Sequence, residues 1–550
     1  MTESPTHKSL VEFLRLRASR TPQQNAIFYF DTGISYQMLD EQSDALASAL
    51  ASLGFRAHDR LALFLQNEPA VVVATFAVWK LGGVVVPLNI MLKEYELDYH
   101  LGDAQAAGVI CGESEADWVA EVARRRGLRF LITVSPYDYL DPARPLPEVV
   151  ASAAPRAAAR QPEEVVALHA LLEKHRGQRL QEPEAPPEEV AYLHYTSGTT
   201  GPSKGAMVTH PSVLFNARSY ERCCGVGLDD CILAIAPLFH ITGAIGHLAT
   251  ACYLGIPMVL LHRFHPAEAI RQTAARKATF TIGALTALVA MLEHPEFDAQ
   301  KLATLTKVFS GGAPVLPAVV ERWEKATGAY IHNVWGMTET TSPGTITPLG
   351  VRAPVDRETG ALAIGLPVPG TEVRIVDPVS GEDLPPSEVG EMLNRGPHIF
   401  RGYWNKSEET AHALRDGWLY TGDFAKVDAE GWVYWIERKK DLIITSGYKV
   451  WPREVEGVLL EHPGVSEVAV IGAPDSYRGE AVTAAVVLKP EWHGKIGEDE
   501  MIAFSRSRLA NYKCPRKVEI LDELPKSPQG KILRKVLRAI AGAEQPAPRP

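Results

Sequence analysis

The chain has 550 residues, more than one hydrophobic core usually serves, so we expect two or more domains. Its formal net charge of −10 at pH 7 argues against a general nucleic-acid binder, which would need a basic surface. Hydrophobic residues make up 46% of the chain and charged residues 22%, as in an ordinary soluble globular protein. The six cysteines show neither a CxxC pair nor the spacing of metal ligands, which favours free thiols in a reducing compartment.

No stretch of the sequence has the pattern of a signal peptide or a membrane span. Residues 1–5 lack a basic segment followed by an apolar one. The longest apolar runs, 71–90 and 243–261, are interrupted by lysine or histidine, glycine and proline, which favours buried helix–strand units. We therefore predict a cytoplasmic protein without a transmembrane segment.

As far as residue 335, apolar helix patterns alternate with short apolar strands, which predicts βαβ units and a mainly parallel sheet. In the first part of this region we expect helices at 9–21, 36–53 and 69–81, and strands at 61–65, 84–87 and 190–195. In the second part we expect helices at 211–220, 243–254, 266–276 and 284–293, and strands at 231–236, 257–261, 279–282, 307–309 and 330–335. Residues 141–189, rich in Pro, Ala, Glu and Arg, are predicted to be loosely structured, with a helix near 163–175.

The pattern changes after residue 365. Short strands punctuated by Gly and Pro predict a small β-barrel over about residues 365–436. Mixed helices and strands beyond it predict a compact α+β module. We therefore predict an α/β fold. Its large N-terminal domain, residues 1–439, would contain parallel-sheet layers plus the barrel, and its small mobile C-terminal domain would span 440–540. Residues 541–550 are predicted to form a disordered tail.

Residues 195–205 consist almost entirely of hydroxyl-bearing residues, glycines, one proline and one lysine. The glycines allow turns that present backbone N–H groups to a ligand, and the hydroxyls and Lys204 suit a polyphosphate. A solvated Gly/Ser/Thr loop is the alternative explanation. The stretch does not match the common P-loop, which has Gly before its lysine and Ser or Thr after it, because Lys204 lies between Ser203 and Gly205.

Three further polar loops follow predicted strands, so loops near residues 196, 240, 311 and 336 all leave strand C-termini. In open α/β sheets, ligands bind beyond these ends. The sequence therefore predicts a ligand site where the four loops converge.

The order and spacing of several motifs resemble the adenylate-forming enzyme superfamily, which includes acyl-CoA synthetases, aryl-CoA ligases, peptide-synthetase adenylation domains and luciferases. The stretch 195–205 is similar to that family's phosphate loop almost residue for residue. The resemblance covers about residues 8–538, and the other motifs follow in the family's order. They are Pro237-Leu238-Phe239-His240, Gly311-Gly312-Ala313-Pro314, Trp335-Gly336-Met337-Thr338-Glu339, Tyr420-Thr421-Gly422-Asp423, Arg438-Lys439-Lys440-Asp441, Ser446-Gly447-Tyr448-Lys449-Val450 and Pro525-Lys526-Ser527-Pro528-Gln529-Gly530-Lys531-Ile532.

The resemblance implies that a carboxylate first attacks the α-phosphate of ATP and expels pyrophosphate. It implies that Thr338 contacts the α-phosphate, that Glu339 holds Mg²⁺, a cation that prefers oxygen ligands, and that Lys531 is the mobile catalytic lysine of this step. It also implies that Asp423 accepts hydrogen bonds from the ribose hydroxyls, assisted by Arg438. The remaining nucleotide-binding positions are Thr196, Ser197, Gly198, Thr199, Thr200, Gly201 and Lys204 at the phosphates, Gly311, Gly312, Ala313, Pro314 and Trp335 around the adenine, and Gly336 and Met337 beside them.

For the second step, the resemblance implies that the small domain rotates about a hinge at Lys440. The thiol of CoA then attacks the acyl-adenylate, which yields acyl-CoA and AMP. We expect His240 to gate or orient the reactants rather than act as a general base, because the attacking carboxylate is already ionised. The expected channel for acyl group and CoA comprises His240, Gly243, Gly311, Gly447, Tyr448 and Lys449.

Two positions depart from the family's pattern: Trp335 replaces the usual tyrosine, and Glu437 replaces a frequent glycine before Arg438. Neither change removes a charge that the reaction needs. The expected acyl pocket has small residues that leave room for a tunnel, and it has neither a fixed cation for a second carboxylate nor an acid suited to an α-amine. These small residues are Gly243, Ala244, Gly246, Gly283 and Ala284.

We therefore predict a ligase that uses ATP, Mg²⁺ and CoA on a medium- or long-chain fatty acid. One alternative is an aryl or arylalkanoic acid as substrate, and another is transfer of the acyl group to an amine or carrier protein. A non-catalytic or light-emitting relative is a further alternative, against which the intact Lys204, Glu339, Asp423 and Lys531 argue. The expected partners are small molecules and no nucleic acid, and a homodimer is compatible with the sequence.

Overall fold

The computed structural model describes residues 9–135, 137–141, 143–152, 165–179, 190–196, 202–357, 359–438, 441–446, 448–475, 478–526 and 532–541. The chain divides into two compact units. Unit 1 comprises Met1–Arg352, Gly365–Glu372 and Asn394–Leu419, and unit 2 comprises Ala353–Ile364, Val373–Leu393 and Tyr420–Pro550. The predicted hinge residue Lys440 lies outside the described residues, and the domain boundary proposed there stays a prediction.

Unit 1 contains a nine-stranded sheet whose central strands are all parallel. At both edges of the sheet, the outermost strands pair with their neighbours in the antiparallel direction. In spatial order the strands are β16 (Leu366–Pro367), β15 (Thr345–Ile346), β14 (Ile331–Trp335), β13 (Lys307–Gly311), β12 (Phe280–Gly283), β10 (Ile232–Leu233), β11 (Met258–Leu260), β1 (Asn25–Tyr29) and β2 (Thr32–Ser35).

A second sheet of unit 1 has seven strands, all parallel except the last. In spatial order they are β7 (Val165–Ala167), β6 (Phe130–Val134), β5 (Gly108–Gly112), β3 (Arg60–Phe64), β4 (Val84–Pro87), β8 (Val190–Tyr195) and β9 (Gly205–Thr209). The expected phosphate loop therefore connects the two strands of an antiparallel hairpin, β8 and β9, at one edge of this sheet.

The four polar loops predicted to converge leave two different sheets. Strands β10, β13 and β14 run parallel in the nine-stranded sheet, so the loops that follow them leave from the same side of the sheet, where the C-terminal ends of the strands lie. Strand β8, which leads into the loop near residue 196, belongs to the seven-stranded sheet. The predictions of parallel βαβ units and of more than one sheet layer are confirmed, but the sequence did not show which strands belong to which sheet.

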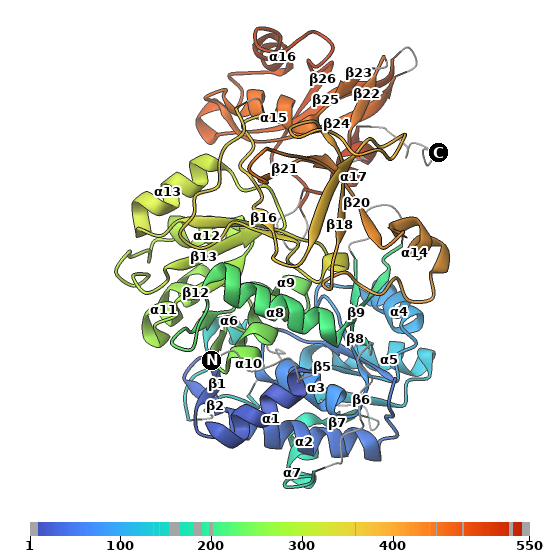
Figure 1. Cartoon of the computed structure of the whole chain (residues 1–550). Coiled ribbons are helices and arrows are strands. Elements are labelled where there is room, and N and C mark those ends of the chain that lie inside the picture. The colour runs from blue at the N-terminus through green and yellow to red at the C-terminus, as the bar shows by residue number, and fades with distance from the viewer. Residues whose placement is uncertain are drawn as a thin grey trace. The chain divides into compact units, whose positions relative to one another are not determined.

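Helices of unit 1 pack in layers against these sheets. The helix α3 (Pro69–Lys80) is buried along its whole length, as expected for a helix that is apolar on all sides. It shares one core with α1 (Leu10–Arg20), α2 (Tyr36–Ser52), α8 (His210–Cys224) and strands of both sheets. On the other face of the seven-stranded sheet, α4 (Glu94–Asp103) and α5 (Ala116–Arg126) lie side by side over a second core (Figure 1).

The remaining helices of unit 1 are short or lie along the nine-stranded sheet. They are η1 (Glu113–Glu115), α6 (Glu148–Ala151), α7 (Leu168–Lys174), α9 (Ile241–Gly243), η2 (Ala244–Ala249), α10 (Thr250–Leu254), α11 (Pro266–Arg276), α12 (Leu285–Glu293), α13 (Pro317–Thr327), η3 (Thr338–Thr340) and α14 (Ser407–Ala413).

The helix predicted over residues 243–254 contains a π-helical segment, η2. The Thr250 hydroxyl donates to the Ile245 carbonyl oxygen, five residues earlier, over 2.9 Å. The buried His247 ring turns inward, and its Nε2 accepts a hydrogen bond from the Ala236 backbone N–H over 3.2 Å. Both bonds favour the wider π geometry, which simple apolar periodicity does not predict.

Unit 2 contains a mixed sheet on which its helices pack. The sheet has β23 (Tyr448–Val450), β22 (Ile443–Thr445), β25 (Gly479–Leu488) and β24 (Val465–Asp475) in order, with β26 (Lys517–Leu521) parallel to β25. The helical segments of this part are α15 (Pro452–Leu460), η4 (Pro490–Trp492), α16 (Glu498–Arg506) and α17 (Arg534–Ile540).

The strands predicted for a barrel form a five-stranded sheet. Its strands are β17 (Glu372–Val376), β18 (Gly390–Arg395), β20 (Trp418–Val427) and β19 (Leu414–Arg415) in order, with β21 (Val433–Arg438) antiparallel to β20. In the part of the chain that the structure describes, no helix combines the length and apolar character needed to cross a bilayer.

Candidate active site

The two ends of the expected phosphate loop are held together in unit 1. The Thr196 N–H donates to the Lys204 carbonyl oxygen over 2.9 Å, and the Ser203 hydroxyl donates to the Thr196 carbonyl oxygen. The Tyr99 hydroxyl, from α4, donates to the Ser203 carbonyl oxygen over 2.8 Å. The stem of the loop is therefore fixed, with Lys204 at its base. The predicted phosphate-binding residues Ser197, Gly198, Thr199, Thr200 and Gly201 lie outside the described residues.

Glu339 lies in a short turn, η3, directly after β14. Its side chain is buried, with the residue only 6% exposed. The side-chain nitrogen of Asn216, on α8, donates to the carbonyl oxygens of Thr340 and Thr341 over 3.0 and 2.9 Å. These bonds fix the turn that follows β14, so Glu339 is held by a rigid backbone. The neighbouring Thr338 is half-buried.

One side chain, Tyr403, contacts both charged residues of this region. Its hydroxyl donates to Oε1 of Glu339 over 2.6 Å, and Nζ of Lys204 lies 4.3 Å from the centre of its ring. Burial, and then the Glu339 carboxylate, raise the pKa of Tyr403 far above its usual value, so it stays a hydrogen-bond donor. Lys204 and Glu339, two predicted residues that are 135 positions apart in the sequence, are thus linked in the structure through Tyr403.

Sequence reasoning missed Tyr403 and Asn216. Tyr403 follows Gly402 in an Arg-Gly-Tyr-Trp stretch, where a glycine beside aromatic residues was the available signal. Asn216 lies in the middle of the α8 apolar pattern, where a buried amide is unusual and needs a partner.

The predicted adenine-binding loops lie on adjacent strands. Gly311 ends β13 beside Val334 of β14, and a Cβ at Gly311 would come within 2.3 Å of the Val334 carbonyl oxygen. Gly312 follows with φ +81°, a left-handed conformation that favours glycine. Ala313 and Pro314 continue this loop toward α13. Glycine is therefore required at 311 by strand packing, and adenine contact at 311–314 stays a prediction.

Trp335 is 7% exposed and packs against a glycine of the following turn. A Cβ at Gly344 would come within 2.6 Å of the indole ring, so only glycine leaves room for it. Gly336 lies against the backbone of residues 342–343, and Met337 packs with Tyr403 in one apolar cluster. The stacking of Trp335 on adenine stays a prediction.

His240 caps α9, and its Nδ1 accepts a hydrogen bond from the Thr242 backbone N–H over 3.3 Å. His194, on β8, is buried, and its burial together with the neighbouring His240 lowers the pKa of His194 to about 3. His194 is therefore uncharged at neutral pH. The structure gives Gly243 a packing role, because a Cβ there would lie 2.1 Å from the Pro237 carbonyl oxygen.

The small residues expected to leave a tunnel are packed against neighbours. A Cβ at Gly246 would lie 2.8 Å from the Ile282 side chain, and one at Gly283 would lie 2.6 Å from Ile235. The space directly beside these glycines is therefore filled. Their size reflects close packing around η2, and the course of the acyl channel stays a prediction.

In unit 2, the predicted ribose-binding residues form a pair. Strands β20 and β21 place Asp423 opposite Arg438, and Nε of Arg438 lies 2.8 Å from Oδ1 of Asp423. Asp423 is fully buried, and its backbone N–H donates to the Thr421 hydroxyl over 3.1 Å. Gly422 lies between Thr421 and Asp423 in β20 and has φ +67°, a left-handed conformation that favours glycine.

The residues expected to serve the second step are described only in part. Tyr448 begins β23, is 58% exposed and stacks on Tyr512 with ring centres 4.7 Å apart. Lys449 lies in the same strand. Lys440, Gly447 and Lys531 lie outside the described residues, and their roles stay predictions.

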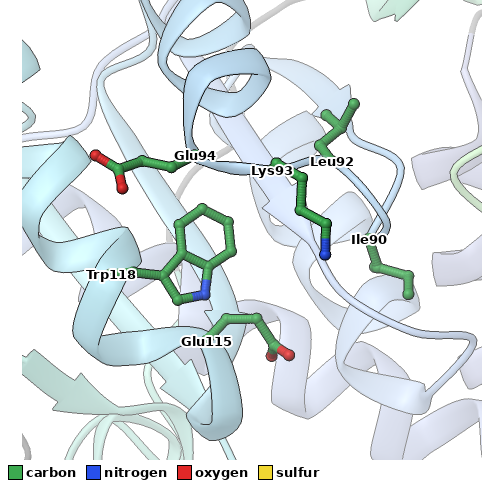
Figure 2. Close-up of a pocket in the computed structure, with 6 residues that line it drawn as sticks. All are labelled: Ile90, Leu92, Lys93, Glu94, Glu115 and Trp118. Atoms are coloured by element: carbon green, nitrogen blue, oxygen red, sulfur yellow. The ribbon is translucent and has the colours of Figure 1, made fainter.

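A separate open pocket of about 340 Å³ lies at the C-terminal ends of β4 and β5 (Figure 2). Figure 2 shows the Trp118 ring on one side and the Lys93 side chain on the other. None of the residues predicted from the motifs lines this pocket. Its lining residues are Ile90, Leu92, Lys93, Glu94, Glu115 and Trp118.

Parallel sheets with a lysine and a buried carboxylate that contact one tyrosine beyond the strand ends have the features of an enzyme that binds nucleotide phosphates. The family model described as AMP-binding enzyme matches residues 14–404, and the one described as AMP-binding enzyme C-terminal domain matches 454–531. The chain therefore belongs to the AMP-binding enzyme family. The resemblance to adenylate-forming enzymes that the motifs indicated is confirmed.

Curated relatives align over nearly the whole chain. A long-chain-fatty-acid–CoA ligase of Bacillus subtilis (strain 168) is 36% identical over 540 residues, which cover 96% of this chain and 94% of that protein. A feruloyl-CoA synthase of an Amycolatopsis species is 35% identical over 523 residues, which cover 95% of this chain and 97% of that protein.

Solved structures share the fold. The ATP-bound crystal structure of MatB from Rhodopseudomonas palustris has a TM-score of 0.84 at 30% identity and covers 97% of this chain and 99% of its own. A benzoate CoA ligase from Burkholderia xenovorans LB400 has a TM-score of 0.80 at 26% identity and covers 96% and 99%. The predicted α/β fold class is confirmed.

Proposed function

We propose that this protein is an ATP-dependent carboxylic acid–CoA ligase that acts through an acyl-adenylate. The observation that carries the proposal is that Lys204 lies over the Tyr403 ring while Glu339 accepts a hydrogen bond from the Tyr403 hydroxyl, beside the stem of the phosphate loop. A cation for phosphate oxygens and a separate carboxylate are the two charges that phosphoryl chemistry on ATP needs. The aligned relatives named as acid–CoA ligases support the same chemistry.

In the first step, a carboxylate oxygen of the substrate forms a bond to the α-phosphorus, and the bond from that phosphorus to pyrophosphate breaks. Lys204 and the hydroxyl of Thr196 would hold the departing phosphates, while Thr338 would contact the α-phosphate. Lys531 would offset the charge that accumulates between the carboxylate and the phosphate, and so lower the barrier.

Glu339 fits a Mg²⁺ ion that arrives with ATP. In the described part of the chain, no group of three or more His, Cys, Asp or Glu residues could hold a resident metal ion. Mg²⁺ bound through phosphate oxygens and waters needs only one or two protein carboxylates, and Glu339 supplies one. Bound there, Mg²⁺ neutralises part of the phosphate charge.

In the second step, the CoA sulfur forms a bond to the acyl carbon and AMP leaves with the bonding electrons. The buried Asp423 would accept hydrogen bonds from the ribose hydroxyls and so keep the adenylate in place, with Arg438 fixing its carboxylate. A rotation about Lys440 would replace Lys531 by the Gly447 segment, whose lack of a side chain admits the pantetheine arm.

We propose a medium- or long-chain fatty acid as the substrate. The long-chain-fatty-acid–CoA ligase relatives support this choice. The second candidate is an aryl acid, which the feruloyl-CoA synthase relative and the anthranilate and benzoate CoA ligase structures favour. The homodimer and the cytoplasmic location stay predictions.

A panel of acids tests the proposal. Saturated fatty acids of increasing length, ferulate and benzoate are each supplied with ATP and Mg²⁺, with and without CoA, and pyrophosphate release is measured. We expect multiple turnovers only when an acid and CoA are both present, with AMP and acyl-CoA as products. Sustained turnover without CoA would exclude the ligase, and a preference for ferulate or benzoate would select the second candidate.

A further inference from the structure

We propose that Tyr403 is a positioning residue for the first reaction step, which keeps Lys204 and Glu339 apart and correctly oriented before ATP binds. The inference rests on the proposed function for its chemistry. It concerns a residue that belongs to none of the motifs from which the site was predicted.

The contacts of Tyr403 place it between the two charges. The hydroxyl donates to Oε1 of Glu339 over 2.6 Å, and the ring face receives the Lys204 ammonium at 4.3 Å. Among the described residues, no ion pair joins Lys204 to Glu339, although both contact the same side chain. A direct pair would have to be broken before phosphates and Mg²⁺ could take these two charges.

The backbone of residues 400–404, here called the clamp segment, fixes Tyr403 on two sides. The Trp404 N–H donates to the Gly205 carbonyl oxygen over 2.8 Å, directly after Lys204 in the chain. The Phe400 N–H donates to the Glu339 carbonyl oxygen over 2.9 Å. The clamp segment therefore ties the phosphate-loop stem to the turn that carries the carboxylate.

The local sequence favours this position for the tyrosine. Gly402 has φ +139°, and a Cβ there would come within 2.6 Å of the Thr410 methyl group, so the position requires glycine. The Thr410 hydroxyl accepts a hydrogen bond from the Tyr403 N–H over 2.9 Å. Tyr403 is 6% exposed and packs edge-on against Phe400, with ring centres 4.9 Å apart. Its rotamer is therefore set before any ligand arrives.

The two contacts of Tyr403 have different chemical consequences. The hydroxyl uses one oxygen of the carboxylate and leaves the second with its lone pairs for a cation. The ring attracts the ammonium without neutralising it, since a cation–π contact is weaker than a desolvated ion pair. Tyr403→Phe removes the first effect and keeps the second, whereas Tyr403→Leu removes both and keeps an apolar side chain in the cluster.

Metal binding and kinetics together test the proposal. Mn²⁺ binding in the presence of a non-hydrolysable ATP analogue is measured by electron paramagnetic resonance, and acid-dependent exchange of pyrophosphate into ATP gives kcat and KM. For Tyr403→Phe we expect Mn²⁺ affinity and kcat to fall about 10-fold, the loss typical of one hydrogen bond to a charged group, while KM for ATP changes less than about 3-fold. For Tyr403→Leu we expect KM for ATP to rise as well, by about 3- to 10-fold.

A double variant separates positioning from general stability. If Tyr403 acts through Glu339, then Glu339→Gln combined with Tyr403→Phe is no more impaired in Mn²⁺ binding than Glu339→Gln alone. Tyr36→Phe is the matched control, because it removes a buried tyrosine hydroxyl that bonds the Ala251 and Ile256 carbonyl oxygens away from the site. Thermal melting of each variant reports folding.

Additive losses in the double variant, or a Tyr403→Phe protein with wild-type Mn²⁺ affinity and kinetics, would overturn the proposal. Failure of the proposed function has another signature, because the wild-type protein would then show no acid-dependent exchange. The Mn²⁺ measurement would still decide the role of Tyr403 in that case, since it needs no turnover.

Discussion

Asn216, in the middle of α8, donates a hydrogen bond from its side-chain nitrogen to the Thr340 carbonyl oxygen over 3.0 Å, although 124 residues separate the two. The same nitrogen donates to the Thr341 carbonyl oxygen over 2.9 Å. Thr341 and Ser342 have φ angles of +53° and +29°, so the chain after Glu339 takes a left-handed path that L residues rarely adopt. The amide of Asn216 holds this path in place.

We expect Asn216→Asp to destabilise the protein and weaken ATP use. The substitution keeps the shape but sets a carboxylate against two buried carbonyl oxygens, which lose their donor. Each unmet buried carbonyl costs about 1–3 kcal/mol, so the loss of the donor to two of them should lower the free energy of unfolding by roughly 2–6 kcal/mol. Denaturant unfolding and KM for ATP measure the two effects. Ser219→Ala on the same helix is the control, and equal behaviour of the two variants would contradict the role of Asn216.

Lys531 is expected to serve the first reaction step only. For Lys531→Ala we predict that acyl-adenylate formation slows by roughly 10²–10³-fold, the loss typical of one donor to the transition state. Thioester formation from supplied acyl-adenylate should be retained, because the lysine is expected to leave the site before that step. Rapid-quench measurement of each half-reaction tests this. Lys535→Ala, an exposed lysine on α17, is the control, and equal loss in both halves would refute the assignment.

Elements with a clear physical start or stop were predicted well from the sequence. Helix α11 matches the predicted bounds, because Pro266 occupies its first turn and Lys277, in a left-handed conformation, ends it. Strand β4 matches its predicted bounds, 84–87, for a similar reason, since Gly82 and Gly83 precede it and Pro87 ends it. Strand β10 is shorter than its apolar run, because pairing partners and not hydrophobicity decide where a strand ends.

The part of the site that was not predicted depends on contacts between distant segments. The motif residues Lys204 and Glu339 could be identified by their similarity to a known family. Tyr403 and Asn216 act by touching them, and no local pattern reports a contact over 64 or 124 residues. Gly243 was predicted from the sequence to leave space for a ligand. In the structure, the Pro237 carbonyl group occupies the space beside it.

In unit 2, Glu437 lies in a buried cluster of charges on both sides of the predicted hinge. The residue is fully buried, and its Oε1 lies 3.4 Å from Arg534, which also pairs with Glu456 over 2.6 Å and with Asp441. Burial, together with the neighbouring Glu456 and Asp441 carboxylates, raises the pKa of Glu437 to about 7, although the Arg534 guanidinium lowers it. Arg453 adds a second cation nearby.

This raised pKa predicts a pH-dependent stability. Between pH 4.5 and about 7 the folded protein retains a proton on Glu437 that the unfolded chain has released. The contribution of this group to stability is therefore complete below pH 4.5 and declines as the pH rises through 7, by about 1.4 kcal/mol for each unit between the two pKa values. Glu437→Gln should remove the decline. Urea unfolding at pH 5 to 8 measures it, with the exposed Glu491→Gln as control, and parallel pH profiles for wild type and Glu437→Gln would contradict the prediction.

Lys80 is buried, with the residue only 2% exposed, and its ammonium group donates hydrogen bonds to three neighbouring side chains. Its Nζ lies 2.8 Å from Oδ1 of Asp40, 2.9 Å from Oδ1 of Asp44 and 2.9 Å from the Ser43 hydroxyl. We expect Lys80→Met to lower the free energy of unfolding by about 3–5 kcal/mol, because it leaves two buried carboxylates with Arg15 as their cation. Arg322→Met, which breaks the exposed pair with Glu293, should have a far smaller effect. Similar losses in the two variants would argue against this account.

The clamp segment also affects the order in which the protein can be completed on the ribosome. Glu339 leaves the exit tunnel 64 residues before Tyr403, which corresponds to about 3–13 seconds at usual elongation rates. During that interval the chain passes through two segments of unit 2, 353–364 and 373–393, before it returns to unit 1. A nascent chain therefore carries an exposed carboxylate turn and an uncovered β9 edge, and slowing translation between codons 340 and 403 should lengthen its exposure to chaperones.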